Sequence, residues 1–173
     1  LCEVARLGVK VCLIAGNHDS AERLAFCAEL LGEGGIHILG ECRGTPQTLI
    51  LEKGEERAAV HMIPHFRPAS LRPFLEAEIS NSEEGFRALI KRADLTLAPT
   101  NILLAHAFVT GAQTSESEQV VVGTVDAVPA DIFSRFDYVA MGHIHGPQNI
   151  GSERIRYCGT PLKYSFSESN HQK

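Results

Sequence analysis

The chain has 173 residues, of which 44% are hydrophobic and 21% are charged, and its formal net charge is -5 at pH 7. This composition is typical of a globular domain and excludes a disordered or collagen-like protein. The acidic balance argues against a domain that holds nucleic acid mainly through a broad basic field. The apolar run at residues 11–15 is far shorter than the roughly 18 residues of a membrane-spanning helix, so no membrane partner is expected.

The cysteines and methionines add two expectations. The five cysteines are an odd number and none are spaced as in a zinc knuckle. We therefore expect reduced, mostly buried thiols and a cytoplasmic location. The chain begins at Leu1 and its only methionines are Met62 and Met141, which predicts a processed product or a piece of a longer chain.

Apolar runs and turn residues predict helices and strands that alternate along one α/β domain. Residues 1–7 have the pattern of the last turns of a helix that Gly8 closes. Residues 9–15 suit a buried strand, and a helix is expected to begin after Asp19 or Ser20. The apolar residues of that helix follow helical spacing: Leu24, Cys27, Ala28 and Leu31.

The rest of the chain predicts short strands, one hairpin and two helices. Residues 47–52 and 57–63 flank a polar segment and are expected to pair as a hairpin. Residues 64–73 are rich in proline and predict a loop, and residues 110–119 are the most polar segment and predict a mobile one. Helices are expected at residues 74–79 and 82–93, and further strands at residues 36–39, 101–105, 136–142, 148–150 and 154–158.

Three of the predicted buried strands end in side chains that can bind a metal ion. In α/β sheets, functional groups gather at the carboxyl ends of the strands. His143 and His145 are two residues apart, which places both imidazoles on one face of an extended segment. Imidazole nitrogens and an amide oxygen suit first-row metal ions. The residues after the three strands are Asn17, His18, Asp19, His106, His143 and His145.

Each of these elements also has an ordinary structural interpretation. Residues 16–19 can form a turn in which Asn and Asp satisfy the local backbone, and a single histidine after a strand, such as His106, is often structural. Their recurrence after three strands favours the metal site. The remaining histidines are assigned no chemistry: His37, His61, His65 and His171.

The segments GNHDSAERL, LLAHAFVTGA, DYVAMGHIHGPQ and YCGTPLKYSFSE, in this order, resemble the calcineurin-like metallophosphoesterases. The chain is most similar to the SbcD-type nuclease subunits of the bacterial SbcCD complex, over residues 11–168. The resemblance implies a metallophosphoesterase-type β-sandwich flanked by helices and incomplete at the N-terminus. Residues 1–173 would then be one partial metallophosphoesterase (nuclease) domain.

The resemblance implies metal ligands and a cofactor. Asn17, His106 and His143 match the ligands of one metal ion, and His145 matches a ligand of a second. The implied cofactor is Mn²⁺, with two ions in the intact site and Mg²⁺ or another divalent ion as alternatives. Two cations roughly 3.5 to 4 Å apart can activate a hydroxide and neutralise phosphate oxygens.

The resemblance also implies two catalytic residues. His18 matches the catalytic histidine at the scissile phosphate, where a protonated imidazole stabilises developing charge. Asp19 is expected to orient it.

The sequence departs from the family pattern in its acidic residues. The family has an upstream Asp-x-His element and a Gly-Asp element, and neither occurs here. The remaining donor set is neutral, so we expect divalent ions to bind weakly and this chain alone to be inactive or nearly so. The missing strands would also uncover a sheet edge and apolar surface, which predicts either self-association, as in a homodimer, or a piece cut from an intact protein.

The leading hypothesis is a part of a Mn-dependent DNA exonuclease/endonuclease subunit that hydrolyses phosphodiester bonds in double-strand break processing. Its expected partners are DNA and an SbcC-like ATPase subunit. One alternative is a metallophosphoesterase that acts on phosphomonoesters or cyclic nucleotides, and another is a non-catalytic scaffold with remnant histidines. Residues 154–168 favour the nuclease branch. A local basic rim for DNA would use Arg67, Arg72, Arg135 and Lys163.

Overall fold

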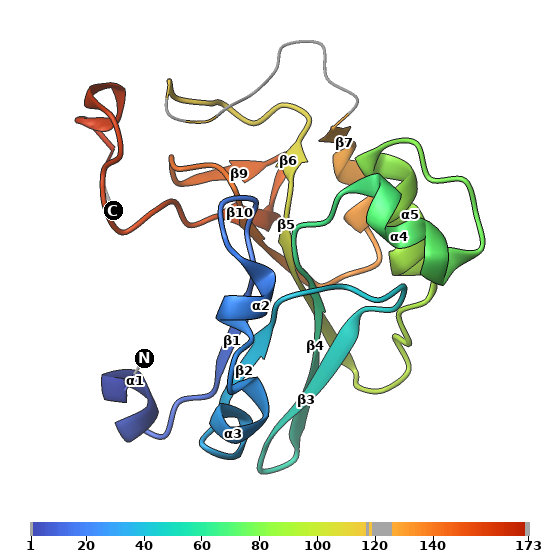
Figure 1. The fold of residues 1–173 in the computed structure, drawn as a ribbon. Helices are drawn as coiled ribbons and strands as arrows, with labels where there is room; N and C mark the ends of the chain where they lie inside the picture. The colour runs from blue at the N-terminus through green and yellow to red at the C-terminus, as the bar shows by residue number, and fades with distance from the viewer. Residues whose placement is uncertain (1, 117, 119–125, 172–173) are drawn as a thin grey trace.

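The computed structural model describes residues 2–116, 118 and 126–171, and its centre is a six-stranded mixed sheet (Figure 1). Its four inner strands run parallel to one another, and each edge strand is antiparallel to its neighbour. The strand order is β3 (Gln47–Lys53), β4 (Glu56–Ile63), β5 (Thr100–His106), β8 (Tyr138–Gly142), β10 (Ser152–Tyr157) and β9 (Gln148–Ile150). The mixed α/β class predicted from the sequence is therefore confirmed.

Two smaller strand pairs accompany this sheet. β1 (Val11–Ile14) runs parallel to β2 (Ile36–Leu39) and lies beside β5. β6 (Phe108–Val109) runs parallel to β7 (Ala127–Val128). Within the described part of the chain, β1 pairs with β2 alone. The two-layer sandwich that the resemblance implies stays a prediction.

Short helices surround the sheets. α1 (Cys2–Arg6), α2 (Ala21–Leu24) and α3 (Ala28–Glu33) lie on the side of β1 and β2, and α4 (Pro68–Leu75) and α5 (Ser82–Lys91) lie on the opposite side of the view (Figure 1). The Asn81 side chain caps α5 by accepting a hydrogen bond from the Glu84 N–H at 2.8 Å. Single turns of 3-10 helix occur at Ala130–Phe133 and Phe166–Glu168. No helix in the described ranges is both long and apolar enough to cross a membrane.

The helix expected after Asp19 is wrong as a single element. It is two short helices because Cys27, between them, adopts a left-handed conformation with a φ of 66°. Of the apolar residues expected on one helical face, Leu24 lies in α2, Cys27 lies between the helices, and Ala28 and Leu31 lie in α3. The strands and the hairpin predicted from residue 36 to residue 63 are confirmed, with β3 and β4 paired antiparallel.

The proline-rich segment also differs from the prediction. Residues 68–75 are helical, because Pro68 occupies the first turn of α4, where a backbone N–H is not needed. The helix ends at Leu75, since Glu76 has a φ of 51°, so the helix expected at residues 74–79 is wrong. The segment predicted to be mobile, residues 110–119, falls partly outside the described residues, at 117 and 119–125.

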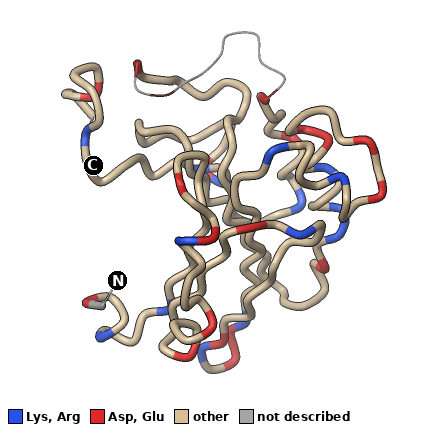
Figure 2. Tube along the Cα trace, viewed as in Figure 1, with Lys and Arg blue, Asp and Glu red and all other residues tan. Residues whose placement is uncertain are grey.

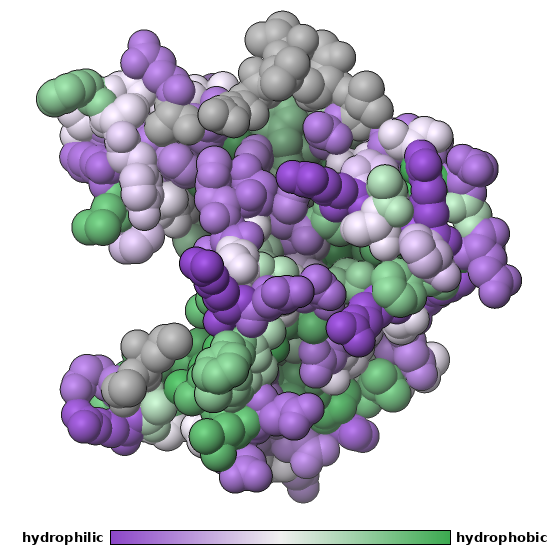
Figure 3. Space-filling model, viewed as in Figure 1, coloured by the Kyte–Doolittle hydropathy of each residue, from purple (hydrophilic) through white to green (hydrophobic). Residues whose placement is uncertain are grey.

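Charged residues of both signs are scattered over the chain trace (Figure 2). The C-terminal segment that carries Lys163 and helix α4, which carries Arg72, lie at opposite sides of the molecule (Figure 1). They do not form one basic rim. Hydrophobic surface lies around α3 (Figure 3), where Leu30 and Phe26, which precedes α3, are exposed.

Tyr157, the last residue of β10, is fully buried in the hydrophobic core and fixes the chain just beyond β5. Its hydroxyl donates to the Ala107 carbonyl at 2.7 Å and accepts from the Val109 N–H at 3.0 Å. Burial raises the pKa of this phenol, although the Val109 hydrogen bond opposes the shift. Because Ala107 follows His106, Tyr157 also positions the end of the strand that carries His106.

Two of the cysteines differ from the expectation of buried thiols. Cys27 and Cys158 are exposed, Cys12 is half-buried and Cys42 is buried, and all four are free thiols. Burial raises the pKa of Cys42 to about 11, against opposing hydrogen bonds from the backbone of Gly44 and Thr45.

Replacing Tyr157 by Phe should destabilise the fold. The change leaves the buried Val109 N–H and Ala107 carbonyl without the partners that the hydroxyl provides, at a cost of about 1–3 kcal/mol in the free energy of unfolding. Urea denaturation measures this loss. Tyr138→Phe is the matched control, because Tyr138 is 37% exposed, and an equal effect of both substitutions would contradict the role of Tyr157.

Thiol labelling of the native chain should proceed in two phases. Cys27 and Cys158 should react fast with a thiol-specific reagent, and Cys42 should react only on unfolding, because it is buried and little of it is thiolate near neutral pH. Mass spectrometry of the labelled peptides, with and without urea, identifies the order. Fast native labelling of Cys42 would contradict the packing described here.

Candidate metal centre

The carboxyl ends of β1, β5 and β8 lie at one edge of the fold and carry the predicted site residues. In the parallel pairing of β5 with β8, His106 lies opposite Gly142, so His143 follows beside it. The turn after β1 brings Asn17 to His106, with Asn17 Oδ1 2.9 Å from the ring nitrogen Nε2. Two residues that are 89 positions apart in the sequence are therefore in contact.

The predicted residues line two cavities that share Asn17, His18, His106, His145 and Thr160. The smaller, of about 110 Å³, is also lined by Glu118 and His143. The larger, of about 540 Å³, is lined by Asn17, His18, His106 and His145 together with Gly16, Asp19, Thr160 and Tyr164. All six residues singled out in the sequence thus lie in one region of the surface.

Two glycines make room for the His106 ring. A Cβ atom at Gly16 would lie 2.7 Å from Cε1 of His106, and one at Gly142 would lie 2.8 Å from its Nδ1. No side chain fits at either position without displacing the imidazole, which explains the glycine before Asn17 and the one before His143. His143 itself has a φ of 109°, an uncommon backbone conformation that costs on the order of 1–3 kcal/mol for a residue with a side chain.

The crowded imidazoles are held in the neutral form. Burial, followed by the nearby His143, His65 and His18, lowers the pKa of His106 to about 3. Burial is also the main cause of the lowered pKa of His143, where Glu118 acts in the opposite direction. A neutral imidazole is the form that binds a metal ion.

Asp19 has a local backbone partner. Its Oδ2 accepts a hydrogen bond from the Gly16 N–H at 2.7 Å, which closes the turn after β1. This turn presents Asn17 and His18 to the cavities. Its expected role in orienting His18 stays a prediction.

Three residues of this region were not singled out in the sequence. His65, which follows β4, lies with its ring 6.0 Å from that of His106, and its pKa is lowered by burial and by Arg67. Because β4 is the neighbour of β5 in the sheet, the position of His65 after the end of β4 could have predicted that it lies near His106. Glu118 and Glu168 enter from segments outside the strands, where the strand pattern gives no signal.

Glu118 brings a carboxylate to the wall of the smaller cavity. Its Oε1 accepts a hydrogen bond from the His145 backbone N–H at 2.5 Å, and its Oε2 accepts one from the Ser115 hydroxyl at 2.6 Å. The carboxylate is thus hydrogen-bonded to the chain around the cavity. It is 8% exposed.

Asn17, His106 and His143 offer one amide oxygen and two imidazoles, which are neutral donors of the types that suit a first-row divalent ion. Nε2 of His106 lies 2.9 Å from Asn17 Oδ1, to which a protonated Nε2 donates, and 3.4 Å from the Asn17 backbone nitrogen, from which a deprotonated Nε2 accepts. The ring of His143 is 5.3 Å from that of His106. Within residues 2–116, 118 and 126–171, no three His, Cys, Asp or Glu side chains form a metal-binding group. The weak binding of divalent ions expected from the sequence stays a prediction.

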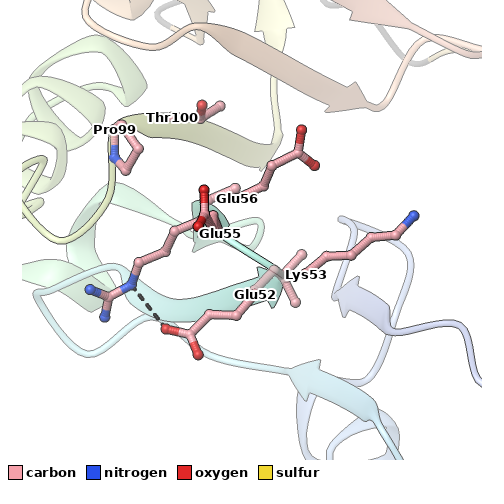
Figure 4. Close-up of a pocket in the computed structure, with 9 residues that line it drawn as sticks. Glu52, Lys53, Glu55, Glu56, Pro99 and Thr100 are labelled. Atoms are coloured by element: carbon pink, nitrogen blue, oxygen red, sulfur yellow. Dashed lines mark ion pairs between the residues drawn. The ribbon is translucent and has the colours of Figure 1, made fainter.

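A separate cavity of about 480 Å³ lies at the opposite end of β5, between the β3–β4 hairpin tip and Pro99 and Thr100 (Figure 4). Its charged residues are at the exposed hairpin tip, and Glu52 pairs with Arg57 at 3.2 Å. An exposed ion pair of this kind contributes little to stability. No histidine lines this cavity, so the chemistry is assigned to the other end of the strands.

No protein-family model matches the chain.

Acid should destabilise the chain through His106. Its pKa is about 3 in the folded chain, against 6.5 as the ordinary value, so between these values the unfolded chain binds a proton that the folded chain does not. Stability is therefore greatest above about pH 6.5 and falls as the pH is lowered, by at most about 1.4 kcal/mol per pH unit for this residue. Urea unfolding at several pH values measures the slope. The His106→Gln variant should show a shallower slope, and an unchanged slope would contradict the burial of a neutral His106.

Proposed function

We propose that this chain is part of a metallophosphoesterase of the SbcD type: a Mn-dependent DNA exonuclease/endonuclease subunit that hydrolyses phosphodiester bonds in double-strand break processing. The observation that carries the proposal is the meeting of Asn17, His106 and His143, each from the end of a different strand. His18 and His145 line the same cavities. These five residues match the family motifs one by one.

In this proposal each residue has one task. Asn17, His106 and His143 would hold one divalent ion and His145 the other. The ions, when bound, supply charge that polarises the phosphate and activates water. His18, which lines both cavities, would donate a proton or a hydrogen bond to an oxygen of the scissile phosphate.

We further propose that the chain alone is inactive or nearly so. The sequence has no Asp-x-His element and no Gly-Asp element, and the described residues contain no metal-binding group of three or more side chains of the usual types. Neutral ligands compete weakly with water for a hard cation. Catalysis would thus depend on the carboxylates of the two missing elements.

DNA, an SbcC-like ATPase subunit and a second copy of this chain are the proposed partners, in the cytoplasm. The acidic balance and the dispersed basic residues make this chain a poor DNA-binding surface by itself. Most of the DNA-binding surface would come from the ATPase subunit and the second copy. A phosphomonoesterase or cyclic-nucleotide phosphodiesterase remains the alternative, because the same metal core serves those substrates.

Manganese should bind weakly and at one place. In NMR spectra of the chain, paramagnetic Mn²⁺ is expected to broaden the signals of Asn17, His106 and His143 first, and His37 and His61 serve as internal controls outside the cavities. Calorimetry should find no more than one site, and a weak one, and His143→Ala should abolish the broadening. Broadening confined to other residues would refute the proposed centre. Two tight sites would contradict the proposal that this chain lacks the acidic ligands of the centre.

The substrate class is tested by turnover. With Mn²⁺ and a linear duplex, this chain should show no sustained hydrolysis, and robust turnover would overturn the proposed inactivity. A chain that also carries the two acidic elements should hydrolyse linear duplex DNA faster than a phosphomonoester. The reverse order would favour the alternative.

A further inference from the structure

Glu168 is a fully buried carboxylate at the edge of the candidate centre. Its Oε1 lies 2.7 Å from Nδ1 of His145 and 3.3 Å from the Ser115 hydroxyl. Its Oε2 accepts a hydrogen bond from the Tyr164 backbone N–H at 2.8 Å. A carboxylate is removed from water at a large cost unless it is hydrogen-bonded, and these contacts provide that compensation.

His145 is fixed on several sides at once. Its backbone N–H donates to Glu118, its carbonyl accepts from the Thr160 N–H at 3.1 Å, and its ring packs on that of Tyr164 at 5.3 Å. The contact of Nδ1 with Glu168 is therefore one part of a well-defined arrangement. His145 lines both cavities.

We propose that Glu168 is a positioning residue that holds His145 with its proton on Nδ1, so that the lone pair on Nε2 is the one presented to the cavities. A carboxylate can only accept hydrogen bonds, so a proton must lie on Nδ1 for this contact to form. Carboxylate partners behind metal-binding histidines fix the tautomer and ring orientation in the same way. The use of Nε2 as a ligand rests on the function proposed above, whereas the tautomer rests on the contact alone.

The geometry around Glu168 predicts the effect of an isosteric amide. In a Glu168→Gln chain, the amide oxygen could accept the hydrogen bond from Nδ1–H of His145. The amide NH₂ group would then face the Tyr164 N–H, so that two donors would be in contact. The opposite orientation satisfies Tyr164 and places the NH₂ group on Nδ1, which must then be the acceptor. The variant should therefore move the proton of His145 from Nδ1 to Nε2.

The test is ¹⁵N NMR of the histidine rings in the metal-free chain, at alkaline pH where the imidazoles are neutral. We expect a protonated Nδ1 at His145 in the unaltered chain, and its loss with a gain of Nε2–H in Glu168→Gln. Glu153→Gln is the matched control, because Glu153 is exposed on β10. A protonated Nε2 in the unaltered chain, or a tautomer unchanged in Glu168→Gln, would overturn the proposal.

This test needs neither metal nor substrate, and so it separates the two proposals. The expected tautomer combined with no Mn²⁺ broadening at His106 would refute the metal centre and leave the role of Glu168 intact. Broadening at His106 combined with the wrong tautomer would do the reverse. Because the unaltered chain alone can give the overturning result, the test does not depend on whether a variant folds.

Discussion

The packing of the His106 ring against two glycine backbones is the constraint on which the rest of the centre depends. Gly16 belongs to the turn after β1 and Gly142 ends β8, so the imidazole holds two segments at contact distance from β5. This close approach excludes water from the ring and sets its protonation. It also fixes the separation at which Asn17 and His143 face it. The arrangement of these side chains thus depends on steric packing as much as on hydrogen bonds.

The location of the centre was predictable because it depends on a simple rule of parallel sheets. Apolar runs marked β1, β5 and β8, and the polar side chains directly after them had to meet at one edge. The glycines next to Asn17 and His143 are explained by the same geometry. The position of a residue at the end of its strand predicts its position in the fold, because β4, β5 and β8 pair in parallel and in register.

The parts that sequence reasoning missed depend on contacts between distant segments. Glu118 and Glu168 reach His145 from 27 and 23 residues away, and no periodicity marks them. The division between α2 and α3 rests on one left-handed residue, Cys27, which is not a glycine and so gave no signal. The sequence did not reveal that α4 starts at Pro68. A segment rich in proline predicts a loop, whereas a single proline in the first turn of a helix is favourable.

The placement of Glu168 has a consequence for the order in which the protein is made. The chain leaves the ribosome from its N-terminal end, so β5 and β8 are available for pairing before residue 168 appears. His145 therefore spends part of synthesis without the carboxylate that sets its proton. The surroundings of His145 are completed only when the segment after β10 folds back, so its contact with Glu168 is among the last to form around the candidate centre.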